Sequence, residues 1–485
     1  MVLVCIAVTV EPQGVFIHPF KKNGKTEIEL IKIEPSLDFD VHNESMFRSP
    51  ESAKFEFPLT KADIQWLNSL FVLPAKNERR VRKEYRTLSE EERETFHRAI
   101  NALKHDKSVS LNKYDLLANI HSRPSSNSAA HGGPAFLGWH RVFLLMMENA
   151  LRQVEPSITI PYWDCTMDAH MTSPAQSAIW SQHFFGNGLG VVDDGPFANW
   201  TTPFGFGLLK RSVSGQRRLI TKQDVARLME HAYLGNISYP YAKADYNLEQ
   251  LHNNVHVWVG GLMKNIEIGA FDPVFYLLHS FIDKIWEDFR RKQILSGIDP
   301  TRDYPKFYGR SSHAPLAPMG LAKLTAIDGI SDIWREGILY VRQPDCRNVL
   351  HQCNSDFLKC DNDKSECVSK TRDEYQTETE ASSAMSDGAI KRGLLKQKTG
   401  FFVNKSNSPM SISVFTQLRV DNSSVTQRKK SRKDRLHFDV YKKFGQKDWT
   451  MGLSRMKSLY RAFQFMKNIT LSKLPVKKNL NLPNG

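Results

Sequence analysis

Residues 251–261 read LHNNVHVWVGG, and they place two histidines on one face of a predicted helix. His252 and His256 are four residues apart, which brings their Cβ atoms to roughly 5–6 Å from each other on a helix. The glycine pair that closes this stretch is expected to end the helix. The spacing therefore lets two imidazoles bind a single ion.

A second helix is expected in FDPVFYLLHSFIDKIW, residues 271–286. Asp272 is a good N-cap residue, and Pro273 suits the first helical position. This helix also carries His279. We predict that His279 joins His252 and His256 as the third member of one metal-binding group.

Another group of three histidines lies upstream, in HSRPSSNSAAHGGPAFLGWHRVFLLMMENALR, residues 121–152. His140 belongs to an apolar helical run, and His131 lies just before that helix begins. The Gly-Gly-Pro sequence at 132–134 indicates a turn into the helix, with the proline in its first turn. A chain that reverses at this turn brings His121, His131 and His140 to one point.

The ligand types indicate which metal the two groups would bind. Three neutral imidazoles without thiolate or nearby carboxylate suit copper, zinc or iron. Zinc does no redox chemistry and iron sites more usually include a carboxylate, so copper is the preferred interpretation. The alternatives are surface His-x-x-x-His pairs and histidines that only pack in the core. They explain the other histidines, including His105, His170 and His183; His105 is the one rival to His121 as a ligand, and it lies at a charged helix end.

The middle of the chain reads as mainly α-helical with long irregular connections. The clearest helix begins after Ser89, has acidic residues in its first turn and ends near Lys107. Residues 11–75 give no strong pattern, and strand-like runs are short. Further helices are expected at about 135–153, 222–233, 245–259 and 273–292.

The charge of the chain is uneven. The 485 residues carry a formal net charge of +14, and residues 388–485 hold 22 Lys and Arg against 4 Asp and Glu, or +18, so the remainder carries −4. The basic character therefore belongs to the C-terminal part, and no specific nucleic-acid partner is expected. Hydrophobic residues make up 41%, which suits a globular chain, and no apolar run is long enough to predict a membrane span.

Several features favour an oxidising compartment and secretion. Cys346, Cys353, Cys360 and Cys367 recur every seven residues. Their even number suits two disulfides, with a zinc cluster or unpaired thiols as the alternatives. The apolar residues 1–10 are a candidate remnant of a signal peptide, although a buried first strand would read the same way. Asn-x-Ser/Thr triplets permit glycosylation.

Four motifs carry a resemblance to the type-3 copper proteins, specifically to tyrosinases of the invertebrate, mollusc-like kind. They are AHGGPAFLGWHR (130–141), IPYWDCTMD (160–168), LHNNVHVWVGG (251–261) and FDPVFYLLHSFIDKIW (271–286). The resemblance runs from about Arg79 to Trp286 and more weakly to about Tyr340. It implies a four-helix bundle holding two copper ions, one bound by His121, His131 and His140 and the other by His252, His256 and His279, with dioxygen as co-substrate.

The resemblance also implies an activity. Tyrosinases hydroxylate a monophenol ortho to its hydroxyl and oxidise the resulting diphenol to an o-quinone, whereas catechol oxidases perform only the second step. The leading hypothesis is a secreted copper-dependent oxidoreductase that makes quinones for crosslinking or pigment from phenolic small molecules or tyrosyl side chains. The alternatives are a haemocyanin-like oxygen-binding protein and a matrix protein in which catalysis has lapsed.

Two further positions gain a role from the resemblance, and others depart from it. Glu249 and Asn253 match a pair proposed to hold a water that accepts the phenol proton, a proton with a pKa of about 10. The alternative is that Glu249 faces solvent and Asn253 is incidental. Leu278 replaces a histidine that borders the substrate pocket in many relatives. Residues 122–130 contain no cysteine, so no thioether to His131 is expected.

We divide the chain into four parts. Residues 1–10 are the candidate signal remnant, 11–345 the tyrosinase copper-binding domain, 346–368 a four-cysteine segment, and 369–485 a linker with a basic tail expected to be disordered. In relatives a C-terminal segment can cover the copper pocket, and this tail is a candidate for that role. Its charge also predicts binding to an acidic extracellular matrix at low salt.

Overall fold

The computed structural model describes residues 15–22, 25–32, 57–347 and 352–378. All of them belong to one compact unit, residues 1–397. A second unit, residues 398–485, lies outside the described residues, as do the candidate signal remnant at 1–10 and residues 379–397. The expectations for those segments stay predictions.

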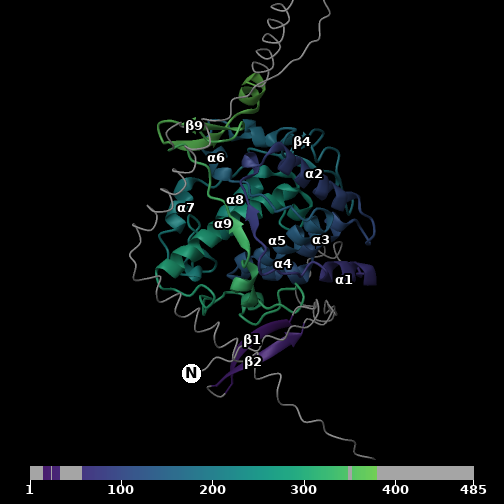
Figure 1. The fold of residues 1–485 in the computed structure, drawn as a ribbon, viewed down its shortest axis with the longest axis vertical. Coiled ribbons are helices and arrows are strands. Elements are labelled where there is room, and N and C mark those ends of the chain that lie inside the picture. The colour runs from purple at the N-terminus through teal and green to yellow at the C-terminus, as the bar shows by residue number, and fades with distance from the viewer. Residues whose placement is uncertain (1–14, 23–24, 33–56, 348–351, 379–485) are drawn as a thin grey trace, which may run out of the picture. The chain divides into compact units, whose positions relative to one another are not determined.

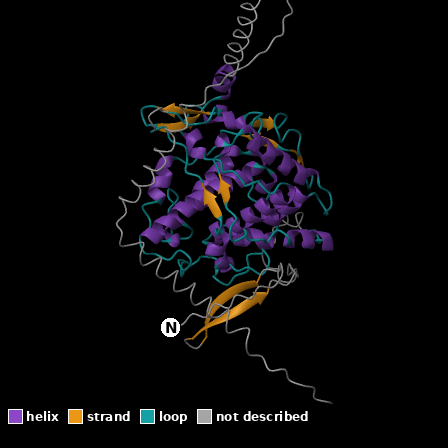
Figure 2. Cartoon of the chain, in the orientation of Figure 1, coloured by secondary structure: helices purple, strands orange, loops and turns teal. Residues whose placement is uncertain are grey.

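Helices form most of the regular structure, as Figures 1 and 2 show, so the mainly α-helical class predicted from the sequence is confirmed. Short 3-10 turns fill many of the connections. The α-helices are α1 (Lys61–Asn68), α2 (Glu90–His105), α3 (Lys113–Ser122), α4 (Pro124–Ala130), α5 (Ala135–Val154), α6 (Cys165–Ala169), α7 (Lys222–Leu228), α8 (Leu248–Val259) and α9 (Val274–Leu295).

The strands of the described residues are short and form two-stranded sheets. The parallel pair of β3 (Arg80–Arg82) with β8 (Ile338–Tyr340) joins segments that precede and follow the helical core in sequence. The antiparallel pairs are β1 (Val15–Lys22) with β2 (Lys25–Lys32), β4 (Leu189–Val191) with β7 (Lys210–Ser212), β5 (Thr201–Thr202) with β6 (Gly207–Leu208), and β9 (Leu358–Asp361) with β10 (Glu366–Ser369).

The centre of the helical body is the pair α5 and α9. Helix α5 packs against α9, α2 and α4, and α8 packs against α9. Every residue of α5 from Ala135 to Leu151 is buried, and so is every residue of α9 from Val274 to Glu287. A helix buried on all sides belongs to the interior. Histidines on these two helices are therefore held deep in the core.

The helix ends follow the capping signals with small differences. Ser89 caps α2 in a capping box with Glu92, and α8 ends at Gly260, whose φ is 68°. Helix α9 begins at Val274, one residue later than expected, but Asp272 makes the predicted capping contact, since its Oδ1 accepts the Val274 N–H at 3.0 Å. The helix expected at 222–233 is shorter, since α7 ends at Leu228.

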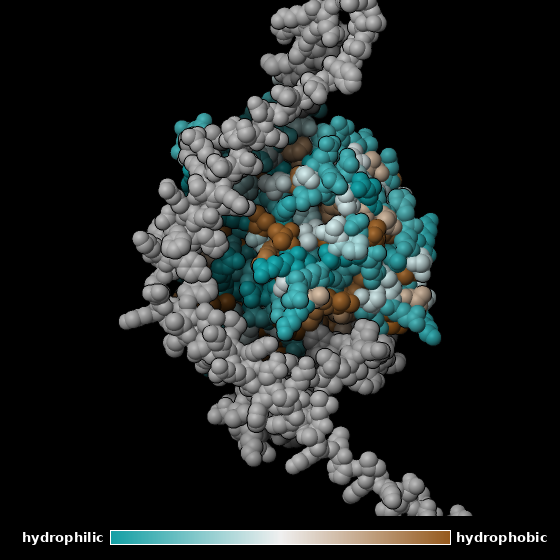
Figure 3. Space-filling model, in the orientation of Figure 1, coloured by the Kyte–Doolittle hydropathy of each residue, from teal (hydrophilic) through white to brown (hydrophobic). Residues whose placement is uncertain are grey.

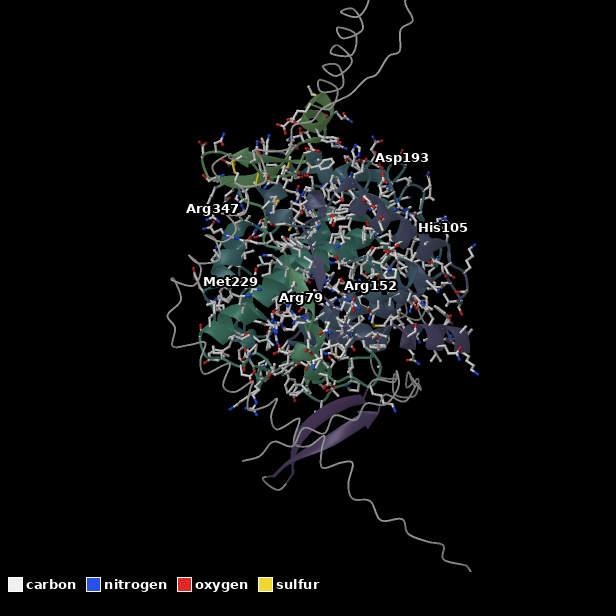
Figure 4. The ribbon with its side chains drawn as sticks, in the orientation of Figure 1. Arg79, His105, Arg152, Asp193, Met229 and Arg347 are labelled. Atoms are coloured by element: carbon white, nitrogen blue, oxygen red, sulfur yellow. A yellow bond between two sulfur atoms is a disulfide. The ribbon has the colours of Figure 1, made fainter. Side chains whose placement is uncertain are left out.

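The four-cysteine segment holds two disulfides, Cys346–Cys360 and Cys353–Cys367. The disulfide prediction is confirmed, and because both bonds use all four sulfur atoms, the zinc alternative is wrong. Figure 4 shows the sulfur atoms gathered near β9 and β10. Among the described residues the free thiol is Cys165, which is buried.

The distribution of polar and apolar side chains in the described residues agrees with the sequence-based expectation of a globular chain. In the face that Figure 3 shows, the described residues are mostly hydrophilic, with scattered apolar patches. Within the described part of the chain, no helix combines the length and the apolar character needed to cross a bilayer. The apolar side chains are instead gathered in one large core that includes the central helices.

Candidate metal centre

Three segments bring His121, His131 and His140 together. His121 lies near the end of α3, His131 directly follows α4, and His140 is in the second turn of α5. One ring nitrogen from each lies within 4.8 Å of the others, and the Nε2 atoms of His121 and His131 are 3.3 Å apart. All three side chains are buried. The turn at 132–134 therefore does bring these histidines to one point, as predicted.

The second trio comes from two helices. His252 and His256 lie on one face of α8, and His279 faces them from α9. The Nε2 atom of His279 is 2.8 Å from that of His252 and 3.5 Å from that of His256. All three are buried, with ligand atoms within 4.8 Å of one another. This is the geometry that the four-residue spacing predicted.

The two trios are in direct contact. The rings of His140 and His279 stack with centroids 4.1 Å apart at an interplanar angle of 17°. Two phenylalanines enclose the six imidazoles: Phe136 contacts His140 and His252, and Phe275 contacts His121 and His279. The two trios thus form one buried centre with an aromatic lining.

All six imidazoles are held in the neutral form that a metal requires. Burial is the largest cause, and neighbouring histidines add to it for most of them: the pKa values of His121, His140, His252 and His279 lie well below the ordinary 6.5. Burial also lowers the pKa of His131 to about 3 and that of His256 to about 4. The centre carries no imidazolium charge at neutral pH.

Hydrogen bonds on the outer nitrogens select the ring tautomer. Nδ1 of His131, His140 and His256 donates to the backbone oxygens of Asn127, Phe136 and Met263, at 3.3, 2.9 and 2.8 Å. Each bond leaves the Nε2 lone pair pointing into the centre.

At His140 no hydrogen-bond donor reaches this lone pair: Nε2 is buried and has no partner among the described residues. Nε2 of His131, His140 and His256 can only accept, because the proton of each ring is on Nδ1. A cation within each trio would satisfy such lone pairs, so the two sets of imidazole nitrogens fit two metal ions of the kind that prefer imidazole.

Glu249 and Asn253 lie one turn apart on α8, beside the second trio. Glu249 is buried, so the alternative that it faces solvent is wrong. Its Oε1 accepts the Gly132 N–H at 2.6 Å, its Oε2 has no partner among the described residues, and burial raises its pKa to about 8. Asn253 Oδ1 accepts from His252 Nδ1 at 3.1 Å. Asn253 therefore orients a member of the trio.

The sequence reasoning missed some residues of the site. Phe136 and Phe275 each stand four residues before a histidine on the same helix, and this spacing was a usable signal for their contact with the centre. His313 had no such signal: it is fully buried, and its Nε2 lies 2.8 Å from the backbone oxygen of His131. Its role depends on a contact between segments far apart in the chain.

Three other residues named in the sequence analysis are not part of either trio. His105 is exposed at the end of α2, at the edge of the molecule in Figure 4, and Nδ1 bonds to the Asn101 oxygen at 2.7 Å. It is no rival to His121. His183 packs against Phe357 and Tyr375. Leu278 is fully buried in the core.

Comparison with known proteins places this centre in a family. Residues 111–292, which hold both trios, match the model for the common central domain of tyrosinase. The chain is 35% identical over 330 residues to tyrosinase-like protein 2 of Margaritifera margaritifera, which covers 61% of this chain and 72% of that protein. This chain belongs to the tyrosinase family.

Other tyrosinase relatives match over different shares of their length. The tyrosinase of Streptomyces glaucescens is 33% identical over 250 residues, 46% of this chain and 88% of that one. A putative tyrosinase-like protein of Caenorhabditis elegans is 33% identical over 300 residues, 58% of this chain, and the match spans 41% of that longer relative.

Solved structures of the tyrosinase and haemocyanin kind are also similar. A polyphenol oxidase from Thermothelomyces thermophila has a TM-score of 0.44 at 20% identity, covering 60% of this chain and 100% of that one. A functional unit of Octopus hemocyanin has a TM-score of 0.42 at 21% identity, covering 54% and 68%.

Proposed function

We propose that this chain is a dicopper phenoloxidase in which His121, His131 and His140 hold one copper ion and His252, His256 and His279 hold the other. The observation that carries the proposal is the pair of buried imidazole trios whose ring nitrogens converge, in contact with each other through His140 and His279. Each trio offers imidazole nitrogens alone, the ligand type that suits copper. Two adjacent copper ions supply the two electrons that binding and activation of one dioxygen molecule require.

The substrates proposed are monophenols and o-diphenols, with o-quinones as products. The lining by Phe136 and Phe275 keeps water from the imidazoles and offers aromatic surface to a phenol ring. Quinones made this way would serve crosslinking or pigment formation, from phenolic small molecules or from tyrosyl side chains.

Glu249 is the residue that we propose handles the substrate proton. A phenol must lose its proton to bind as phenolate, and its ordinary pKa is about 10. Glu249 Oε2 is buried beside the centre with no partner among the described residues, so it can hold a water that takes this proton. Burial keeps the pKa of Glu249 near 8, and bound copper cations would favour its ionised form. Asn253 holds His252 in orientation from the next turn.

Secretion is part of the proposal. Two disulfides are typical of proteins that fold in an oxidising compartment. Two of the Asn-x-Ser/Thr sites, Asn199 and Asn236, are exposed and so open to glycosylation.

The experiment compares the purified wild-type chain with His256→Ala and with His105→Ala as the matched control. Copper is measured per chain, and quinone formation is followed with a monophenol and with catechol. We expect two copper ions and sustained quinone formation in the wild type and in His105→Ala, and loss of both in His256→Ala. Copper with bound oxygen but no quinone would favour the haemocyanin-like alternative, and a chain without copper would favour the lapsed matrix protein.

A further inference from the structure

His313 lies in a segment that the family-model match at 111–292 does not include. It ends a 3-10 turn, Ser311–His313, and follows two exposed residues, Arg310 and Ser311. Its own side chain is nevertheless 0% exposed. The ring is therefore turned from a surface loop into the core, where it reaches the first trio.

The ring of His313 bonds to the backbone on both sides of the Gly132–Pro134 turn. Its Nε2 lies 2.8 Å from the backbone oxygen of His131, and its Nδ1 lies 3.4 Å from the Ala135 N–H. A carbonyl only accepts and an amide N–H only donates, so Nε2 carries the proton and Nδ1 accepts. One neutral imidazole thus joins His131 to Ala135, the first residue of α5, which is the helix that carries His140.

The packing at Gly133 is shaped by the same ring. A Cβ atom at Gly133 would lie 2.4, 2.5 and 2.8 Å from the Cγ, Cδ2 and Nδ1 atoms of His313. Gly133 does not have a positive φ, so its backbone would accept an alanine, and His313 supplies the steric reason for a glycine. Gly132 differs, because its φ of 83° itself requires glycine.

His131 needs such support more than the other five histidines. The others lie within helices α3, α5, α8 and α9, whose ladders fix their backbones. His131 has extended backbone angles, φ −135° and ψ 147°, just after α4. Two bonds hold the peptide that follows it: the His131 oxygen accepts from His313 Nε2 at 2.8 Å, and the Gly132 N–H donates to Glu249 at 2.6 Å. Tyr304 anchors His313 in turn by donating to its backbone oxygen at 2.8 Å.

We infer that His313 is a positioning residue for His131, acting through the backbone from a loop outside the matched family core to set the geometry of the first copper site. This inference rests on the proposed function, because it takes His131 as a copper ligand. Partners that orient a ligand typically change metal affinity about 10- to 100-fold when they are removed. We expect the first site to weaken more than the second, since both hydrogen bonds of the His313 ring go to the turn that positions His131 and His140.

The first test compares copper-loaded wild type, His313→Ala and His313→Gln. The glutamine keeps an N–H donor near the position of Nε2. The readouts are copper retained per chain during a chelator challenge and the melting temperature of each metal-free protein. We expect His313→Ala to lose one of two copper ions about ten times faster, and His313→Gln to regain most of the retention while its metal-free melting temperature stays as low as that of His313→Ala.

Equal copper retention in His313→Ala and wild type, or no rescue by glutamine, would overturn the inference and leave the proposed function standing. A wild-type chain that binds no copper would instead overturn the proposed function. The two failures are therefore distinguishable in one experiment.

The second test uses Gly133→Ala in both backgrounds. In the wild type the added methyl group must push against the His313 ring, so copper retention should fall. In the His313→Ala background the clashing atoms are gone, so the same substitution should change retention less than twofold. An equal loss of copper retention in the two backgrounds would contradict the claim that contact with the His313 ring is the reason for a glycine at position 133.

Discussion

Burial changes the ordinary acid–base chemistry of Glu249. Its pKa of about 8 in the fold lies above the ordinary 4.5, because burial disfavours the charged carboxylate. A carboxyl whose pKa is raised on folding contributes stability at low pH that is lost as the pH rises. We expect metal-free wild type to lose a few kcal/mol of unfolding free energy relative to Glu249→Gln between about pH 5 and pH 8. Urea unfolding across this range measures the difference.

Glu230→Gln is the control for that experiment, because Glu230 is exposed. Its unfolding free energy should follow that of the wild type at every pH. If wild type and Glu249→Gln instead gave parallel curves from pH 5 to pH 9, the buried carboxyl would not be protonated in the folded protein as described.

At the same scale, the histidines show what a sequence can and cannot predict. His252 and His256 were predictable because helix periodicity places them together, and the Gly-Gly-Pro turn indicated how His131 could approach His140. His313 was not predictable, since its partner is a backbone oxygen 182 positions away. Glu249 carried no signal of burial, because the glycine amide that it accepts from belongs to the other trio's turn.

Helices α5 and α9 are joined by a buried ionic contact next to the centre. Arg141, which follows His140, donates to Asp283 at 2.7 Å and to Glu287 at 3.1 Å, and its guanidinium lies 4.0 Å from the centroid of the Trp286 ring. Asp283 is one turn beyond His279 on α9. This contact therefore holds the two helices in the register that stacks His140 on His279.

Removal of the Arg141 charge should be costly, because it leaves buried carboxylates with less compensation. We expect Arg141→Met to lower the unfolding free energy of the metal-free protein by about 3–5 kcal/mol. Arg98→Met is the matched control: Arg98 pairs with Glu94 at 3.6 Å on the exposed face of α2, and its loss should cost less than about 0.5 kcal/mol. Similar losses in the two variants, measured by urea unfolding, would argue against a structural role for the buried contact.

Local signals determined how well the elements were predicted. Helices α2, α5, α8 and α9 have caps and apolar runs that could be read directly. Helix α1 was not predicted although Thr60 and Asp63 form a capping box, because the helix is short and lies in a stretch without a clear hydrophobic periodicity. The pairing of β3 with β8 had no local signal, since it depends on the helical core that separates the two strands in sequence.

For the whole molecule, the uneven charge predicts a salt-sensitive interaction. Residues 388–485 carry 22 basic and 4 acidic side chains, and the rest of the chain has a net charge of −4. We expect the full chain to bind an immobilised polyanion at low salt and to elute as the salt concentration rises, because the Debye length falls from about 10 Å at 0.1 M to about 3 Å at 1 M. Chromatography of a chain that ends at residue 387 should show no retention, and retention of that shorter chain would place the binding surface on the body.

The central claim is that six buried imidazoles hold two copper ions side by side. Anomalous diffraction at the copper edge, from crystals of the copper-loaded chain, tests it most directly. The account predicts two peaks, one among His121, His131 and His140 and the other among His252, His256 and His279. A single peak, or copper bound away from both trios, would contradict it.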